Sequence, residues 1–124
     1  MATLNAADAV LAKAREPWFA DRPAILHAGG VLTYRELDSA ASRAANALVG
    51  LGLGRGERVC FLMKDTPLFC AAYLGALRAG LVAIAMNTRL TPAEQAFIVA
   101  DANARILIAD PDFLPAAQAA RGAA

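Results

Sequence analysis

One pattern occurs three times in this chain and restricts its fold more than any other feature. A short apolar run is followed by a capping residue, a proline and then a helical pattern, with Thr66, Thr91 and Asp110 each directly before the proline. Such side chains accept a hydrogen bond from the first turn of a helix, and proline at the first helical position removes no backbone bond. Glu94 adds a capping box to Thr91. We therefore predict three helix starts, each just after a strand.

The apolar runs before these caps are predicted to be strands of one parallel sheet. They are continuously apolar rather than alternating, which indicates burial on both faces. Because a helical pattern follows each run, the connections are expected to be right-handed crossovers. The runs are Val59 to Met63, Leu81 to Met86 and Ile106 to Ala109.

The segments before the first of these strands predict a hairpin between two helices. "AILHAGGVLTY" reads as two short strands that turn at Gly29-Gly30, and Thr33 with Glu36 forms a second capping box that opens an amphipathic helix. A further helix is expected near residues 6 to 15. The predicted fold class is therefore α/β, a partial doubly wound parallel sheet flanked by helices and preceded by a short β-hairpin.

The segment "PLFCAAYLGALRAG" is apolar on all sides and rich in alanine and glycine, so we expect its helix to be packed between neighbours. It lies within Thr66 to Thr88, which has one charge in twenty-three residues and raises the question of a membrane span. That charge, Arg78, stands in the middle, and the uncharged stretch before it is shorter than the ~20 residues that a spanning helix needs. No membrane span is expected.

Charge and cysteine content exclude several classes of protein. The 124 residues suit one modest domain, and twelve basic and eleven acidic residues, scattered along the chain, leave a net charge of +1. Nucleic acid and anionic membrane surfaces are therefore not expected as partners. Cys60 and Cys70 lie in apolar runs without metal or redox spacing, and the first residues do not form a secretory signal. We expect buried, reduced thiols rather than a disulfide or a metal site, and a cytoplasmic location.

Three apparent motifs have simpler explanations. "GLGLGRGER" contains no GxGxxG and runs from a helix into a strand, the reverse of a dinucleotide site, so it is interpreted as a helix end. His27 is the one histidine, and the sequence indicates no serine or cysteine nucleophile to pair with it, so no catalytic triad is proposed. Asp65, Asp110 and Asp112 could suggest a phosphoacceptor pocket, but paired acids after a first strand are missing and helix capping explains Asp110. No catalytic and no metal-ligating residue is predicted.

Polar residues gather just past the carboxyl ends of the predicted strands, which is the edge where open α/β sheets bind ligands. Arg89 is the most informative of them, because a guanidinium beside the first N–H groups of the helix that begins at Thr91 would make an anion site. A solvated or ion-paired arginine is the alternative. The residues at this edge are Lys64, Asp65, Thr66, Asn87, Thr88, Arg89 and Asp110.

The chain from about Pro23 to Asp110 closely resembles the N-terminal region of the AMP-forming acyl-CoA ligases, the adenylate-forming superfamily. The resemblance rests on "LTYRELD", "GLGRGERV", "AAYLGALRAG", "NTRLTPAE" and "ARILIAD" in this order. "DTPLF" and "NTRLT" look most like the aryl-CoA ligases of the benzoate type. The resemblance implies that residues 1–124 form part of the AMP-binding N-terminal domain, without the remainder of the family fold.

The resemblance also implies a chemistry for a complete enzyme of this family. A small carboxylate reacts with ATP, in the presence of Mg²⁺, to give an acyl adenylate and pyrophosphate, and the acyl group then passes to the thiol of coenzyme A. In some aryl-CoA ligases the arginine of the N-x-R-L segment, which corresponds to Arg89, contacts the phosphates of CoA. The family's phosphate loop and catalytic lysine have no counterpart in this sequence, so the chain alone is not expected to catalyse the reaction or to bind these cofactors tightly.

Two hypotheses of different classes follow. The first is an N-terminal fragment of an acyl- or aryl-CoA ligase, and the second is a self-standing, non-catalytic α/β binding or interaction module. A sheet of a few strands has unpaired edges and an uncovered apolar face, so we also expect self-association through an exposed sheet edge, or a molten state, for the isolated chain.

Overall fold

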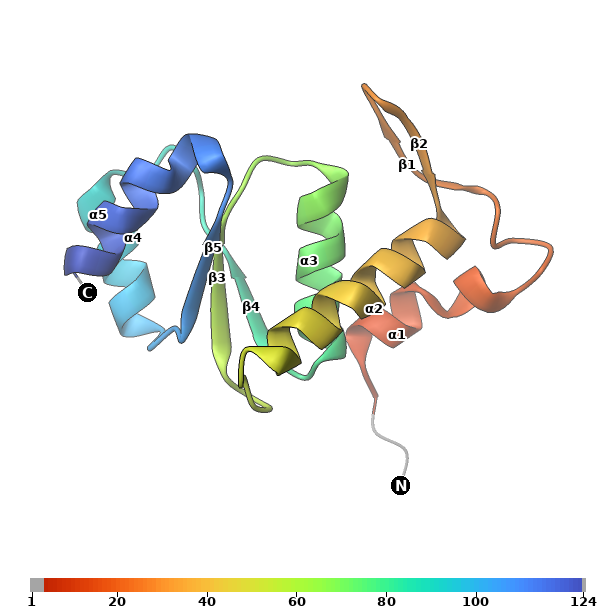
Figure 1. Ribbon diagram of the computed structural model, residues 1–124, viewed down its shortest axis with the longest axis horizontal. Helices are drawn as coiled ribbons and strands as arrows, with labels where there is room; N and C mark the ends of the chain where they lie inside the picture. The colour runs from red at the N-terminus through yellow and green to blue at the C-terminus, as the bar shows by residue number, and fades with distance from the viewer. Residues whose placement is uncertain (1–3, 124) are drawn as a thin grey trace.

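The computed structural model describes residues 4–123, in which a helical N-terminus and a hairpin are followed by alternating helices and strands (Figure 1). The bounds, in chain order, are α1 Ala6–Val10, the 3-10 helix η1 Ala12–Arg15, β1 Pro23–His27, β2 Gly30–Thr33, α2 Tyr34–Gly50, β3 Arg58–Leu62, α3 Pro67–Arg78, β4 Val82–Ala85, α4 Pro92–Asp101, β5 Ile106–Ala109, the 3-10 helix η2 Pro111–Phe113 and α5 Leu114–Ala123.

The predicted parallel sheet is present, and its strand order is β4-β3-β5. Both neighbours of β3 run parallel to it, with Val59 opposite Ala83 on one side and Ile106 on the other. The chain passes from β3 to β4 at one edge and then returns across β3 to place β5 at the other. This reversal makes the sheet doubly wound, as predicted, and places the switch point between β3 and β5.

Helices cover both faces of this sheet (Figure 1). Val59 and Phe61 of β3 belong to the apolar cluster on the side of α3, whereas Cys60 and Leu62 belong to the cluster on the side of α4 and α5. All four side chains are fully buried, so β3 has the two-faced burial that its sequence predicted. The edge strands do not, because Val82 of β4 is 45% exposed. The prediction of burial on both faces is therefore wrong at β4, and at β5 it is met only in part, because all four residues of β5 are half-buried.

Helices α2 and α3 pack closely because small residues line their contact. Gly75 of α3 is buried, and a Cβ atom built on it would lie 2.6 Å from the Cβ of Ala44 and 2.7 Å from the carbonyl oxygen of Ala41. Only a glycine fits at this distance. The helix lies between the sheet and the layer formed by α1 and α2, which confirms that the all-apolar segment is packed between neighbours.

Arg78, the charge that interrupts the apolar segment, joins three helices. Its Nε lies 3.0 Å from a carboxylate oxygen of Asp8 in α1, and its Nη2 lies 2.8 Å from Asp38 in α2. Its Nη1 donates to the Ser42 hydroxyl at 3.0 Å. The Arg78 side chain is only 13% exposed, so these partners replace the water that its charge loses on burial.

The N-terminal segment differs from its prediction. The single helix expected near residues 6 to 15 is divided at Leu11, because α1 ends at Val10 and the 3-10 helix η1 begins at Ala12. Asn5 caps α1 through its side-chain oxygen and donates through Nδ2 to the carbonyl oxygen of Leu77 at 2.8 Å. The hairpin is antiparallel as predicted and projects away from the parallel sheet (Figure 1). Its turn residues are Ala28 and Gly29, one position before the predicted pair, and Gly30, with φ 131°, begins β2 opposite His27.

Two further sequence predictions concern the thiols and membranes. Both cysteines are free, but Cys70 is only half-buried while Cys60 is fully buried, and burial raises the pKa of the Cys60 thiol. No helix among residues 4–123 combines the length and the apolar character that a membrane crossing needs.

Candidate functional site

The carboxyl ends of the three parallel strands lie at one edge of the sheet, and polar residues from two of the following loops line a cavity of about 450 Å³ there. Lys64 and Asp65 follow β3, while Asn87 and Thr88 follow β4. These four predicted edge residues therefore line one cavity. The rest of its lining is apolar and consists of Met63, Phe69, Ala85 and Met86.

Asp110 also reaches this edge, but its role differs from the predicted one. Its carboxylate does not cap the following helix; it accepts the backbone N–H of Lys64 at 2.7 Å and so joins the ends of β5 and β3. The chain then forms η2 before α5 begins at Leu114. The prediction of a side-chain cap is wrong because a backbone N–H in the loop after the neighbouring strand β3 donates to this carboxylate.

Lys64 and Asp112 complete this connection across the switch point. The Lys64 Nζ lies 2.7 Å from a carboxylate oxygen of Asp112. This hydrogen bond and the attraction between the charges lower the pKa of Asp112 and raise that of Lys64. Because the ammonium is already paired, it is less available to a bound anion than Arg89.

The loop that carries Arg89 is fixed from two sides. The side-chain oxygen of Asn87 accepts the backbone N–H of Arg89 at 2.9 Å, and the Nε2 of Gln95 donates to the carbonyl oxygen of Leu90 at 3.2 Å. Gln95 is 2% exposed, and its Oε1 has no partner among the described residues. The backbone of Arg89 is thus held between a turn and a buried amide.

The first turn of α4 offers less to an anion than its sequence suggested. The predicted capping box is present, because the Thr91 hydroxyl accepts from the Glu94 N–H at 3.2 Å and the Glu94 carboxylate accepts from the Thr91 N–H at 2.9 Å. Pro92 has no N–H to give. The capping box therefore occupies the N–H groups of Thr91 and Glu94 and presents the Glu94 carboxylate, so anion binding at this edge depends mainly on Arg89.

The Arg89 side chain is exposed and forms no ion pair within residues 4–123. It stands beside the cavity and is not among the residues that line it. The edge consequently combines the unpaired guanidinium of Arg89 with a polar cavity. At the switch point, the contacts of Lys64 with Asp110 and Asp112 join the ends of β3 and β5. This arrangement can bind an anionic group, and the described residues that line the cavity include no nucleophile–base pair.

A second, apolar hollow adjoins the polar cavity and shares Asp65, Phe69 and Ala85 with it. Its volume is about 480 Å³, and Cys70, Tyr73 and Leu74 of α3 complete its wall. β4 contributes only its last residue, Ala85, to this hollow.

Two contributors to this edge escaped the sequence analysis. Gln95 looked like any polar residue of a first helical turn, and only its burial under the 87–91 loop distinguishes it. The bond from Lys64 to Asp110 joins positions 46 residues apart, for which a single sequence contains no signal.

The comparison with protein families decides the family of the chain. Residues 13–124 match the family model described as AMP-binding enzyme. The chain belongs to the AMP-binding enzyme family. Among curated members, the 3-hydroxybenzoate–CoA/4-hydroxybenzoate–CoA ligase of Thauera aromatica is 44% identical over 112 residues, which cover 90% of this chain and 21% of that ligase. A long-chain-fatty-acid–CoA ligase of Mycobacterium tuberculosis is 36% identical over 75% of the chain.

Solved members of the AMP-binding enzyme family have the same fold. A benzoate CoA ligase from Burkholderia xenovorans LB400 superposes with a TM-score of 0.91 at 34% identity, over 98% of this chain and 24% of that one. An anthranilate CoA ligase in complex with anthranoyl-AMP gives 0.89 at 33% identity. The resemblance to acyl-CoA ligases is thereby confirmed. The chain spans about a fifth of the length of the curated relatives that it matches.

Proposed function

We propose that residues 1–124 supply part of the N-terminal domain of an ATP-dependent acyl- or aryl-CoA ligase, of the benzoate type. The complete enzyme would convert a small carboxylate, ATP and CoA to acyl-CoA, AMP and pyrophosphate through an acyl adenylate, with Mg²⁺ beside the ATP. The 44% identity to a hydroxybenzoate–CoA ligase supports the aryl assignment. We place the enzyme in the cytoplasm, a location that its two free thiols favour.

Within this function we assign Arg89 to the phosphates of CoA. The observation that carries the assignment is an exposed guanidinium without an ion pair in the described residues, on a backbone held by Asn87 and Gln95 at the ligand edge of the sheet. A planar guanidinium suits phosphate oxygens because it donates two parallel hydrogen bonds. The chain alone contributes a binding element and no reacting group, so we expect it to be inactive by itself.

The test places the chain in a working enzyme. In a chimera, residues 13–124 replace the matched region of the Thauera ligase, and Arg89→Gln is compared with the parent chimera. We expect the KM for CoA to rise about 10- to 100-fold, the loss of a charged hydrogen bond of about 1.5–3 kcal/mol. The rate of ATP–pyrophosphate exchange, which reports adenylate formation without CoA, should remain nearly unchanged.

Arg55→Gln is the matched control, because Arg55 is exposed in the turn that precedes β3, at the opposite edge of the sheet. It should leave both half-reactions unchanged. If Arg89→Gln lowered the rate of ATP–pyrophosphate exchange as much as the rate of the CoA-dependent half-reaction, Arg89 would have a role in folding rather than in CoA binding. A chimera that folds but shows no ligase activity even at high CoA concentration would favour the alternative, a non-catalytic binding module.

A further inference from the structure

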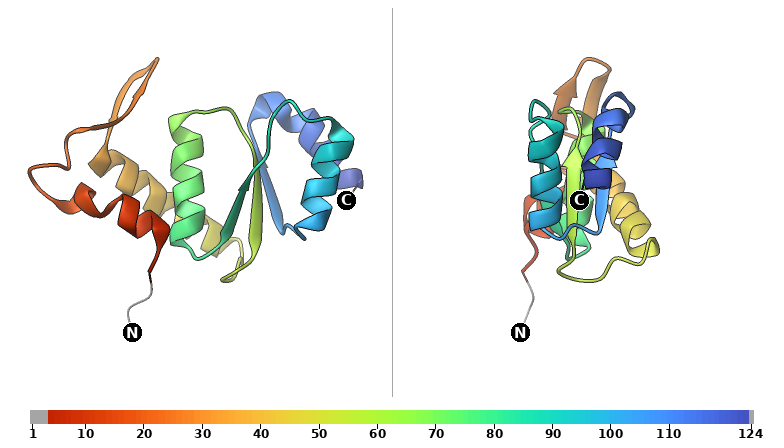
Figure 2. Two further views of the ribbon diagram at one scale, coloured as in Figure 1. Left: turned by 180° about the vertical axis from the view of Figure 1, so that it is seen from behind. Right: turned by 90° about the vertical axis from the view of Figure 1, so that its left-hand side faces the viewer.

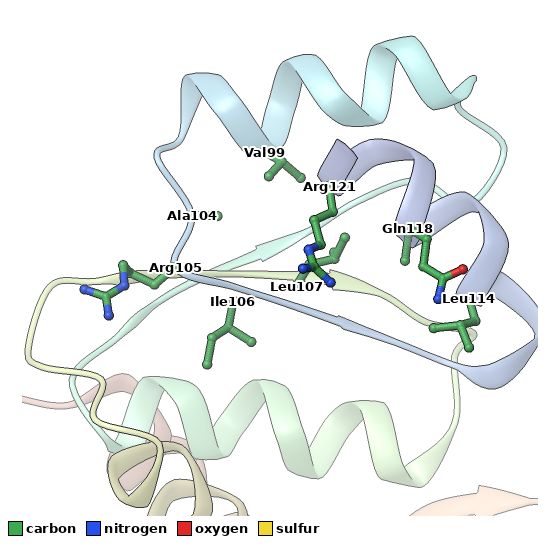
Figure 3. Close-up of a pocket in the computed structure, with 9 residues that line it drawn as sticks. Val99, Ala104, Arg105, Ile106, Leu107, Leu114, Gln118 and Arg121 are labelled. Carbon is green, nitrogen blue, oxygen red and sulfur yellow. The ribbon is translucent and has the colours of Figure 1, made fainter. Parts of the chain in front are cut away.

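A single polar side chain, Gln95 of α4, is fully buried among residues 4–123. α4 packs beside α5 on one face of the parallel sheet (Figure 2). Val99 lies one turn after Gln95 on the same side of α4, and it points toward the sheet in a groove of about 440 Å³ (Figure 3). The other buried residue of α4 is Ala96. The covered face of α4 is therefore apolar apart from Gln95, and an apolar side chain would suit this position.

The amide of Gln95 is only partly satisfied. Its Nε2 donates to the carbonyl oxygen of Leu90 at 3.2 Å, whereas its Oε1 has no partner among the described residues. An unpartnered oxygen in a buried site lowers stability, and most buried polar atoms in proteins are hydrogen-bonded. Departures from such rules concentrate at functional sites. Because the bond to Leu90 is what distinguishes Gln95 from an apolar residue of similar size, we expect its role to lie in this bond.

The bond to Leu90 fixes one of three successive peptide groups around Arg89. A peptide group is planar, so a hydrogen bond at either end restrains the whole group. The side-chain oxygen of Asn87 holds the first group through the Arg89 N–H at 2.9 Å, and its carbonyl oxygen holds the second through the Leu90 N–H at 3.3 Å. Gln95 holds the third group through the Leu90 carbonyl. The backbone that carries the Arg89 side chain therefore lies between restrained groups.

These restraints differ in their exposure to water. The side chain of Asn87 is exposed, and so is that of Glu94, which accepts the Thr91 N–H at the far end of the third peptide group. Water competes with hydrogen bonds of exposed groups, whereas a hydrogen bond from a buried donor is electrostatically stronger. Gln95 is therefore the contact that ties this loop to the interior of the protein.

We propose that Gln95 is a positioning residue for ligand binding. Its buried amide holds the Leu90 carbonyl, and this contact keeps the Arg89 guanidinium at the edge of the polar cavity. Gln95 does not touch the ligand and acts through Arg89. The identity of the ligand as the phosphates of CoA rests on the proposed function, whereas the restraint on the loop does not.

Gln95→Met tests the restraint, because methionine has a similar length, lacks the donor and removes the unpartnered oxygen. In the chimera with the Thauera ligase, and without CoA, hydrogen exchange followed by mass spectrometry should be about 3- to 10-fold faster in residues 87–91. Exchange in the rest of α4 should be unchanged. Gln118→Met, at an exposed position on α5, is the matched control and should change neither rate.

The kinetics of the same chimera test whether the restraint acts through Arg89. Gln95→Met should raise the KM for CoA about 3- to 10-fold, the effect of one neutral hydrogen bond, and should leave ATP–pyrophosphate exchange nearly unchanged. Added to Arg89→Gln, it should cause no further rise, because the two residues act on one interaction. If Arg89→Gln alone left the KM unchanged, the CoA assignment would fail, and hydrogen exchange in residues 87–91 would still decide the role of Gln95.

Three results would overturn the proposal. The first is hydrogen exchange in residues 87–91 that Gln95→Met leaves unchanged. The second is faster exchange throughout α4 together with slower ATP–pyrophosphate exchange, because Gln95 would then serve only the packing of the helix. The third is a further rise in the KM for CoA when Gln95→Met is added to Arg89→Gln, since Gln95 would then act by a route other than Arg89.

Discussion

At the scale of single residues, Gly75 makes the sharpest demand on side-chain size. The Cβ of an alanine there would stand 2.6 Å from the Cβ of Ala44 and 2.9 Å from the backbone nitrogen of Ala45. Gly75→Ala should therefore force α2 and α3 apart and lower the free energy of unfolding by about 1–3 kcal/mol, as overpacking does in other cores. Urea unfolding followed by circular dichroism measures this change.

Gly50→Ala is the matched control for this prediction. Gly50 is the last residue of α2, and a Cβ on it would have no neighbour within 4 Å. This change should stabilise the protein by about 0.4–1 kcal/mol, since alanine loses less backbone freedom on folding. If both variants were stabilised to the same extent, the close approach at Gly75 would not limit the packing of the helices.

Single residues were predictable where their partners are near in sequence. Thr33, Thr66 and Thr91 cap their helices as expected, because each hydroxyl accepts from a backbone N–H three residues ahead. Asp110 was not predictable, since a competing donor 46 residues away takes its carboxylate. Gln95 was missed for a similar reason, because the fold and not its neighbours in sequence buries it.

At the scale of elements, the N-terminus of α2 couples helix stability to pH. The Glu36 carboxylate accepts the backbone N–H of Thr33 at 3.0 Å, and this bond lowers the pKa of Glu36. A lowered pKa means that the folded state prefers the ionised form. The stabilisation is therefore complete above the pKa of the unfolded chain, about 4.3, and is lost as the pH falls through the folded value.

Replacement of Glu36 by glutamine tests this coupling. Glu36→Gln retains an oxygen that can accept from Thr33 but cannot titrate. The difference in melting temperature between the natural chain and this variant should be largest near neutral pH and should shrink between about pH 5 and pH 3. Glu16→Gln, which changes an exposed carboxylate outside the capping box, controls for net charge. A difference that stays constant across this range would contradict the assignment.

Element type and order were more predictable than the burial of elements. Each strand has a run of apolar residues, and α2, α3 and α4 each have a local threonine cap, so the sequence of types follows from short-range signals. Burial depends on neighbours in the sheet, and β4 lies at an edge that no local signal identifies. The same limit applies to the N-terminal helix, which is divided at Leu11 although its residues favour one continuous helix.

At the scale of the whole molecule, the candidate site was predictable because parallel strands end at one edge. Lys64, Asp65, Asn87 and Thr88 were expected together there and do line one cavity. The binding of CoA phosphates by Arg89 stays a prediction, which the kinetics of the Arg89→Gln chimera test. The ion pair between Lys64 and Asp112 forms only when β3 and β5 are neighbours in the sheet, and the sequence contains no indication of that adjacency.

The open sheet also predicts how the isolated chain behaves in solution. Among residues 4–123, β4 has one strand partner, and its Val82 is 45% exposed. An apolar hollow lined by Phe69 and Tyr73 adjoins its last residue, Ala85. Such an edge promotes pairing with another chain, and a lysine on it discourages pairing. We therefore expect the chain to self-associate as its concentration rises, and Val82→Lys to remain monomeric over the same range in sedimentation velocity.

Val49→Lys, at an exposed position on α2, introduces the same charge away from the sheet and should self-associate like the natural chain. A natural chain that sediments as one sharp monomer at every concentration, with protected amides in β4, would contradict this expectation.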